Sequence, residues 1–210
     1  MIRARHIPFF VRFFSWYSKN ELKRFFHRIE FLCDVDVSRS PVLLIGNHFS
    51  WWDGFIAFRL NDLMLHKKFH VMMLEEQLKG RMFLNKAGAY SIKRGSRSVI
   101  DSLSYTSSLL RERDNLAVIY PQGEITSIHR RPMVFEKGIE RILKDAPEEL
   151  MILFYVALPD WFSEQKPSLT VRVTVRVPAV AFLRGSGPGP RSWAGWPRCP
   201  TPEAARATRA

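Results

Sequence analysis

The feature that most constrains the fold is a continuous apolar run at residues 41–45 (PVLLI). One glycine separates this run from Asn47 and His48. A strand with one face in water shows a polar residue at every second position, whereas a continuous apolar run is typical of a strand buried on both faces. Residues 115–120 and 151–158 form further apolar runs that are also predicted to be strands. The chain therefore carries short buried strands, the first of which ends at a histidine.

Helical segments alternate with these strands. Further predicted helices span residues 53–60, 75–84, 98–113 and 135–144, and further predicted strands span 69–73, 89–92 and 170–177. The last strand alternates polar and apolar residues, which is typical of an edge strand. The alternation of strands and helices predicts a layered α/β domain, with a mostly parallel sheet flanked by helices.

The first thirty-two residues are unusually aromatic and basic. The chain holds 16 Phe and 6 Trp, many of them within the first sixty residues. Residues 1–32 are predicted to form an amphipathic helix. Its apolar residues are Ile7, Phe9, Phe10, Phe13, Phe14 and Tyr17, continued by Phe25, Phe26, Ile29 and Phe31. Two interpretations remain open: the helix contacts a membrane surface, or it packs on the protein's own core.

The formal net charge is +12, from 32 Lys and Arg against 20 Asp and Glu. Such an excess suits nucleic acid, an anionic membrane or an acidic substrate, and charge alone does not choose among them. No recognised nucleic-acid motif is present, and the aromatic residues lie with Leu and Ile in apolar runs. No nucleic-acid partner is therefore predicted.

Cysteine and histidine spacing gives no metal site. Cys33 and Cys199 are far apart, so neither a metal-ligand pattern nor a disulfide framework is predicted, and a reducing cytosolic location is the simplest fit. His66 and His70 are four residues apart but lack a helical pattern, so a metal pair is not predicted. No run of 18 or more apolar residues occurs, and no membrane span is predicted.

The composition changes near residue 177. Residues 178–210 are rich in Pro, Gly, Ala and Arg, with one acidic residue, Glu203, and no Lys. Such a segment buries too little apolar area to offset the entropy of ordering. We therefore expect a membrane-contact segment (1–32), a folded domain (33–177) shortened at its C-terminal end, and a disordered tail (178–210) that resembles out-of-frame or replaced sequence.

His48 and Asp53 are the candidate catalytic pair. They follow a predicted strand directly, where α/β sheets place their active residues. A histidine suits proton transfer near neutral pH, and an aspartate five residues on can bond the imidazole and fix its tautomer. No Ser or Cys is needed if a substrate hydroxyl is the nucleophile. Taken alone, the same spacing also fits a structural histidine beside a helix-capping aspartate.

Further segments extend this pair into a recognisable series. Asn47-His48-x4-Asp53 resembles the first motif of the 1-acylglycerol-3-phosphate acyltransferase (lysophospholipid acyltransferase) family. In the family's order, residues 92–96 (IKRGS) resemble its second motif, 120–124 (YPQGE) its third, a Phe-Pro-Glu-Gly-Thr loop, and 135–138 (FEKG) the Phe-Lys-x-Gly segment after it. A weaker match to the fourth motif lies at 156–159 (VALP). Together the matches cover about residues 40–160.

The resemblance implies an acyltransferase domain over residues 33–177. His48, oriented by Asp53, would remove a proton from an acceptor hydroxyl that attacks the thioester of acyl-CoA or acyl carrier protein. The second-motif arginine, thought to meet the acceptor's phosphate, maps to Arg94. The residues implied to bind substrate are Lys93, Arg94, Gly95, Ser96, Gln122, Gly123 and Glu124. Backbone amides around Gly123 are candidate oxyanion donors. The resemblance implies no metal, and no cofactor besides the acyl donor.

Departures from the third motif keep several acceptors open. Gln122 replaces the family's glutamate, an acid appears at Glu124, and Ile125 stands where a basic or small residue is usual. The acceptor is a lysophospholipid such as 1-acylglycerol 3-phosphate or, alternatively, an amino-acid-derived lyso-lipid of the ornithine- or glycine-lipid kind. A non-catalytic membrane-binding module is a further interpretation, against which the intact His48–Asp53 pair argues. The expected location is peripheral, on the cytoplasmic face of a bacterial inner membrane.

Overall fold

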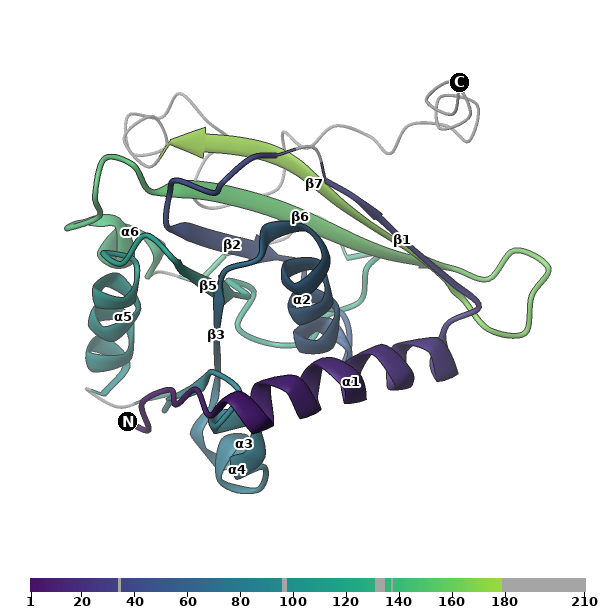
Figure 1. Cartoon of the computed structure of the whole chain (residues 1–210), viewed down its shortest axis with the longest axis horizontal. Helices are drawn as coiled ribbons and strands as arrows, with labels where there is room; N and C mark the ends of the chain where they lie inside the picture. The colour runs from purple at the N-terminus through teal and green to yellow at the C-terminus, as the bar shows by residue number, and fades with distance from the viewer. Residues whose placement is uncertain (34, 96–97, 131–134, 137, 179–210) are drawn as a thin grey trace.

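The computed structural model describes residues 1–33, 35–95, 98–130, 135–136 and 138–178, excepting the side chains of residues 174–178. Its centre is a seven-stranded sheet with the order β1-β7-β6-β2-β5-β3-β4 (Figure 1). The strands are β1 (Arg28–Leu32), β2 (Val42–Gly46), β3 (Lys68–Leu74), β4 (Ala89–Ile92), β5 (Asn115–Ile119), β6 (Met151–Asp160) and β7 (Ser168–Pro178). The helices are α1 (Pro8–Phe25), α2 (Asp53–Leu60), the π-helix η1 (Asn61–Leu65), α3 (Glu75–Lys79), α4 (Met82–Asn85), α5 (Ser98–Leu109) and α6 (Ile139–Leu143). The predicted α/β fold with an N-terminal helix is confirmed.

Strand β2 lies in the middle of the sheet and is buried along its whole length. It pairs in parallel with β5 on one side, where Leu43 is opposite Ala117, and with β6 on the other, where Leu43 is opposite Ile152. Strands β6 and β7 pair antiparallel, while the β1–β7, β3–β4 and β3–β5 pairs are parallel. The carboxyl ends of β2, β5 and β6 therefore meet at one edge of the sheet.

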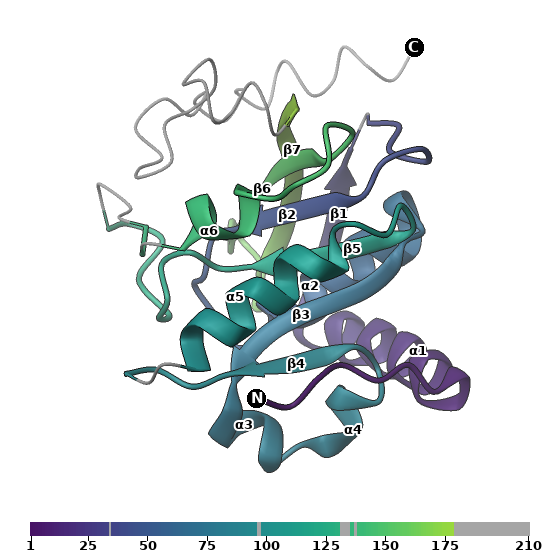
Figure 2. The same cartoon turned by 90° about the vertical axis from the view of Figure 1, so that its left-hand side faces the viewer.

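The two faces of the sheet carry separate cores, because successive residues of a strand point to opposite sides. Leu44 and Val118 belong to the core that includes residues of α1 and α2. Leu43 and Ala117 belong to the core that includes residues of α6, with Leu103 of α5 packed against it. Figure 2 shows α5 in front of β5 and β3, with α2 behind them. Helices on both faces explain why β2 reads as a continuous apolar run.

The predicted helix over residues 1–32 is wrong at both ends, because α1 begins only at Pro8 and stops before residue 28. Helix α1 ends at Phe25, and residues 28–32 form β1, which pairs in parallel with β7. The sequence Arg-Ile-Glu-Phe-Leu alternates polar and apolar residues before its last position, as a strand does, and β7 supplies a partner about 140 residues away in the chain. The prediction that residues 170–177 form an edge strand is also wrong, because β7 lies between β1 and β6.

Other differences concern helix lengths. The predicted helix 75–84 is divided into α3 and α4 around Gly80, a residue with low helix propensity. Helices α5 and α6 are shorter than predicted, and the remaining elements agree with prediction to within two residues at each end. Of the predicted disordered tail, Pro178 ends β7, and residues 179–210 lie outside the described residues.

Helix α1 is fixed at both ends and packs on α2. Before it, the Ile2 carbonyl accepts a hydrogen bond from the Ser91 N–H (2.9 Å), and after it β1 joins the sheet. In its middle, the Phe14 ring lies 5.3 Å from the Phe55 ring and 4.7 Å from the Phe58 ring, centroid to centroid. These aromatic contacts hold α2, whose first turn carries the candidate aspartate.

Gly46, the last residue of β2, leaves room for the ring of Tyr155. A Cβ atom at position 46 would lie 2.3 Å from Cε1 of that ring, and Tyr155 is fully buried. We predict that Gly46→Ala lowers the free energy of unfolding by about 1–3 kcal/mol, the usual cost of overpacking a core. Urea denaturation measures the loss. In the control Gly80→Ala, the new Cβ would meet its nearest neighbour, the Gln77 carbonyl oxygen, at 3.7 Å. Equal stabilities of the two variants would contradict the prediction.

Candidate functional site

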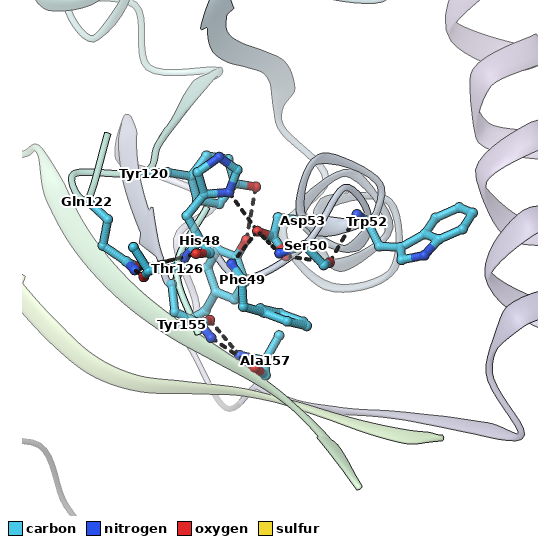
Figure 3. A network of polar contacts seen from close by, with 11 residues as sticks. His48, Phe49, Ser50, Trp52, Asp53, Tyr120, Gln122, Thr126, Tyr155 and Ala157 are labelled. Atoms are coloured by element: carbon cyan, nitrogen blue, oxygen red, sulfur yellow. Dashed lines mark hydrogen bonds and ion pairs between the residues drawn. The ribbon is translucent and has the colours of Figure 1, made fainter. Parts of the chain in front are cut away.

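The loop after β2 brings His48 and Asp53 into contact. Strand β2 ends at Gly46 and α2 begins at Asp53, so the chain turns within residues 47–52. His48 Nδ1 lies 2.7 Å from Asp53 Oδ2 (Figure 3). The structure thus places the two side chains as the five-residue spacing predicts.

The Asp53 carboxylate is buried, with 1 % of its surface exposed, and its oxygens are saturated with hydrogen bonds. Besides His48, Oδ2 accepts bonds from the N–H groups of Phe49 (2.8 Å) and Ser50 (3.1 Å), and Oδ1 accepts one from the Ser50 hydroxyl (3.0 Å). Asp53 is also the first residue of α2, where the helix dipole favours negative charge. These donors hold the carboxylate in one orientation.

The carboxylate fixes the tautomer of His48. An ionised carboxylate only accepts hydrogen bonds, so Nδ1 carries the ring proton and Nε2 keeps a lone pair. The His48 side chain is 25 % exposed, whereas that of Asp53 is shielded. A ligand can therefore reach the histidine, which is available to accept a proton, but not the aspartate behind it.

The side chain of Gln122 braces the backbone of His48 from the other side (Figure 3). Its Oε1 accepts a hydrogen bond from the His48 N–H (2.6 Å), and its Nε2 donates to the His48 carbonyl (3.4 Å) and contacts the Thr126 hydroxyl. The Thr126 N–H donates to the same carbonyl (2.9 Å). Gln122, which the motif resemblance implies to bind substrate, is thus engaged in positioning the histidine.

Two tyrosines lie next to the pair: Tyr120, the first residue of the third-motif segment, and Tyr155, which the sequence did not single out. The Tyr120 ring stacks on the His48 imidazole, with centroids 4.7 Å apart and planes at 19°. The Tyr155 hydroxyl donates to the Tyr120 hydroxyl (3.0 Å). Burial is the main cause that raises the pKa of both phenols well above the ordinary value. Asp53 adds to the rise for Tyr155, and Tyr155 and then Asp53 add to it for Tyr120. Both rings therefore stay neutral beside the imidazole.

Asn47 ties the end of β2 to β6. Its Nδ2 donates to the Ala157 carbonyl and its Oδ1 accepts from the Ala157 N–H, both at 2.9 Å, and the side chain is buried. These bonds continue the strand pairing one residue beyond β2. They fix the point at which the chain leaves the sheet, and with it the position of His48.

A cavity of about 660 Å³ joins His48 to a set of apolar side chains. Its charged and polar lining consists of His48, Ser50, Gln77, Arg94, Glu124 and Glu136. Its apolar lining includes Phe55, Val71, Met72, Met73, Leu84, Leu103, Ile119, Ile139 and Ile142. The histidine therefore stands in the wall of a largely apolar space that has a few charged groups.

The structure brings together only part of the predicted substrate-binding set. Arg94, Gly95, Gly123 and Glu124 line the cavity with His48, and Lys93 is exposed and does not line it. Ser96 lies outside the described residues. The two tryptophans after His48 have different surroundings. Trp52 packs on Phe25, with 4.5 Å between ring centroids. Trp51 lines the cavity, and the Arg81 guanidinium lies over its ring.

Gly123 makes a tight turn that only glycine fits easily. Its φ is +71°, and a Cβ atom there would lie 3.0 Å from Cγ of Glu136. Its N–H donates to the Tyr120 carbonyl (3.0 Å), so this amide is occupied in the turn. The neighbouring amides of Gln122 and Glu124 are therefore better candidates for oxyanion donors.

The histidines at positions 66 and 70 lie on separate elements. His66 follows η1 with a φ of +51°, and His70 is buried in β3, 3.2 Å from Asn115 Oδ1 through Nε2. Burial lowers the pKa of His70 to about 4, so its ring is neutral. Within the described ranges, no group of three or more His, Cys, Asp or Glu side chains is arranged to hold a metal.

Removing the Gln122 amide would leave the His48 N–H without its partner. We predict that Gln122→Ala lowers the free energy of unfolding by about 1 kcal/mol, at the lower end of the cost of an unpaired donor because this hydrogen bond is only partly buried. Gln122→Glu keeps an acceptor for that N–H, so its free energy of unfolding should fall by less. Urea denaturation compares both with Gln165→Ala at an exposed position. A Gln122→Ala midpoint equal to that of Gln165→Ala would rule out the bracing role.

Comparisons with known proteins bear on this site. The sequence model of the Acyltransferase family matches residues 15–159, more than half of the chain, including His48 and Asp53. The fold resembles the crystal structure of the 1-acyl-sn-glycerophosphate (LPA) acyltransferase PlsC from Thermotoga maritima, with a TM-score of 0.59. The two share 11% sequence identity, and the likeness covers 82% of this chain and 70% of that chain, which shows a common fold. A search of curated protein sequences gives no match. The family match, with the His48–Asp53 geometry, gives the conclusion that this chain belongs to the acyltransferase family.

Proposed function

We propose that the protein transfers a fatty acyl group from acyl-CoA or acyl carrier protein to the hydroxyl of a lyso-lipid such as 1-acylglycerol 3-phosphate. The observation that carries this proposal is the His48–Asp53 contact in the wall of an apolar cavity. The fold neighbour PlsC is by name a 1-acyl-sn-glycerophosphate acyltransferase, which supports the same class of acceptor.

The proposed reaction is a direct transfer. Nε2 of His48 takes the proton from the acceptor hydroxyl as its oxygen attacks the thioester carbonyl carbon. The new C–O bond forms, the C–S bond breaks, and the thiol of the donor leaves with the proton. Asp53 stabilises the imidazolium that exists between the two proton transfers, because its buried carboxylate accepts the Nδ1–H at 2.7 Å.

A base alone does not account for such catalysis. General base catalysis contributes about 10²–10⁴-fold, so donors must also stabilise the negative charge that develops on the carbonyl oxygen. The loop 120–124 lies beside His48, since Gln122 bonds its backbone and Gly123 lines the same cavity. We assign the oxyanion to the backbone amides of this loop.

The apolar part of the cavity suits an acyl chain. The whole cavity has a volume of about 660 Å³, within the range of about 300–1,000 Å³ typical of pockets that enclose a small ligand. Its walls come from residues of β3, α2, α4, α5 and α6. A chain buried there would leave its thioester carbonyl at the polar wall, beside His48.

Helix α1 supports attachment to a membrane surface. Its buried residues are Phe14, Ser18 and Leu22, and its exposed large apolar residues include Phe9 (70 % exposed), Phe13 (40 %) and Trp16 (62 %). At 100° per residue the two sets lie on opposite sides of the helix. The helix therefore has one face that packs on the protein's own core and an opposite face that is free to contact a membrane.

The outward face has the composition of an interfacial helix. Exposed cations flank the aromatic residues, namely Arg12, Lys19, Lys23 and Arg24. Aromatic rings at the headgroup level with cations beside them bind anionic bilayers. Over the described residues, no helix is both long and apolar enough to cross a bilayer. We propose that this outward face binds the protein peripherally to a membrane, on the cytoplasmic face of a bacterial inner membrane.

A second acceptor class is an amino-acid-derived lyso-lipid of the ornithine- or glycine-lipid kind. The observation that favours it is the acidic lining of the site, where Glu124 and Glu136 face the cavity beside Arg94. A non-catalytic membrane-binding module would need no ordered imidazole–carboxylate pair, so the network around Asp53 speaks against it.

His48→Ala removes the base and should lower the rate of acyl transfer by about 10²–10⁴-fold or more. Asp53→Asn leaves a side chain that no longer fixes the tautomer, with an expected loss of about 10⁴-fold, as in serine protease triads. The measurement is transfer of a labelled acyl group from both donors to a panel of lyso-lipids. His27→Ala, on an exposed histidine after α1, is the control. A folded His48→Ala protein with unchanged activity would refute the mechanism.

Replacing Phe9, Phe13 and Trp16 together by Ser should weaken binding to anionic phospholipid vesicles by more than about tenfold. A tenfold loss of affinity corresponds to about 1.4 kcal/mol of binding free energy, and three large apolar side chains contribute more than that. Vesicle co-sedimentation at two salt concentrations separates apolar from electrostatic binding. The variant should keep its fold, since these side chains lie opposite the buried face. The control is Ile100→Ser, which changes an exposed apolar residue of α5. Equal vesicle binding by both variants would exclude α1 as the membrane contact.

A further inference from the structure

Opposite charges flank Gly123 in the wall of the cavity. Measured from the place of a Cβ atom at Gly123, Arg94 Nη2 lies at 3.5 Å and Glu136 Oε1 at 3.8 Å. All three residues line the cavity that contains His48. Within the described part of the chain, the Arg94 and Glu136 side chains have neither a hydrogen bond nor an ion pair of 4.0 Å or less. Both charges are therefore available to a ligand.

The backbone holds Glu136 at this place. Its N–H donates to the Pro121 carbonyl (2.7 Å), which ties it to the 120–124 loop, and the Phe135 side chain before it is buried. Glu124 lines the same cavity and lies 3.8 Å from Arg130 at the surface. The described charged lining of the cavity thus consists of one guanidinium and two carboxylates.

This arrangement suits a head group that carries both signs of charge. A head group with only negative charge would be attracted by Arg94 but repelled by Glu136 and Glu124. A head group with an anionic and a cationic part would place the first against Arg94 and the second against Glu136. Opposed charges on the two sides of one glycine select for the orientation of the head group as well as for its charge. The Phe-Lys-x-Gly segment of the resembled family carries a lysine where this chain has Glu136.

We infer that the acceptor is a zwitterionic lyso-lipid, with Arg94 binding its anionic group and Glu136 its ammonium group. The inference deepens the proposed acyl transfer and rests on it for the identity of the bound molecule as an acceptor. Glu136 then determines specificity, and His48 and Asp53 carry the chemistry for any acceptor that binds.

Binding without donor tests the inference. His48→Ala protein is titrated with short-chain lyso-lipids below their micellar concentration: lysophosphatidylethanolamine, a lyso-ornithine lipid and lysophosphatidate. We expect one of the two zwitterions to bind at least about tenfold more tightly than lysophosphatidate, a difference of about 1.4 kcal/mol. Which zwitterion binds better tells whether Arg94 receives a phosphate or a carboxylate. A preference for lysophosphatidate would overturn the inference.

Charge reversal at one position provides the second measurement. In the same His48→Ala background, Glu136→Lys should invert the preference toward lysophosphatidate. With Glu136→Gln, the ratio of the two affinities should lie between those of Glu136 and Glu136→Lys. Glu140→Lys makes the same change on an exposed residue of α6 outside the cavity lining and should leave the ratio unchanged. A ratio unaffected by Glu136→Lys would overturn the role of Glu136.

Transfer by the protein with His48 intact is measured in parallel with the same three lipids. Transfer to a zwitterion that Glu136→Lys redirects to lysophosphatidate would support both proposals. An intact binding preference without transfer to any acceptor would overturn the acyl-transfer proposal and not the head-group preference. Transfer to all three lipids at equal rates would overturn the head-group preference and leave the acyl-transfer proposal standing.

Discussion

The burial of β2 between two parallel neighbours is the constraint on which the rest of the site depends. With β5 and β6 on its sides and helices on both faces, the strand has a fixed register and a fixed end. Asn47 extends the pairing to β6 by two side-chain hydrogen bonds, so the polar loop begins at a defined point. His48 is the next residue, and its position depends both on this fixed end of the strand and on its contacts with Gln122 and Asp53.

The polar network around His48 is stable in an apolar setting because its buried atoms are paired. A buried carboxylate without partners would be costly, but Asp53 accepts hydrogen bonds from an imidazole, two amides and a hydroxyl at the start of a helix. The neutral ring of Tyr120 stacks on the imidazole and is itself hydrogen-bonded to Tyr155. The His48 ring is thus ordered while its side chain remains partly exposed.

Helix α1 links this site to the proposed membrane surface. Phe14 packs on Phe55 and Phe58 of α2, and Asp53 begins that same helix. The opposite side of α1 carries exposed aromatic and basic residues. A single helix thus contributes both to the core behind the His48–Asp53 pair and to the proposed membrane-contact face.

The sequence by itself determined the α/β class, the buried central strand and the His48–Asp53 contact. Those features depend on neighbouring residues: a continuous apolar run requires cover on two faces, and a five-residue spacing closes one turn at a helix start. Only the tertiary structure decided that residues 28–32 form a strand, since their partner β7 is about 140 residues away. The same holds for Gln122 as a brace and for Glu136 opposite Arg94, because segments distant in sequence meet there only after the sheet has formed.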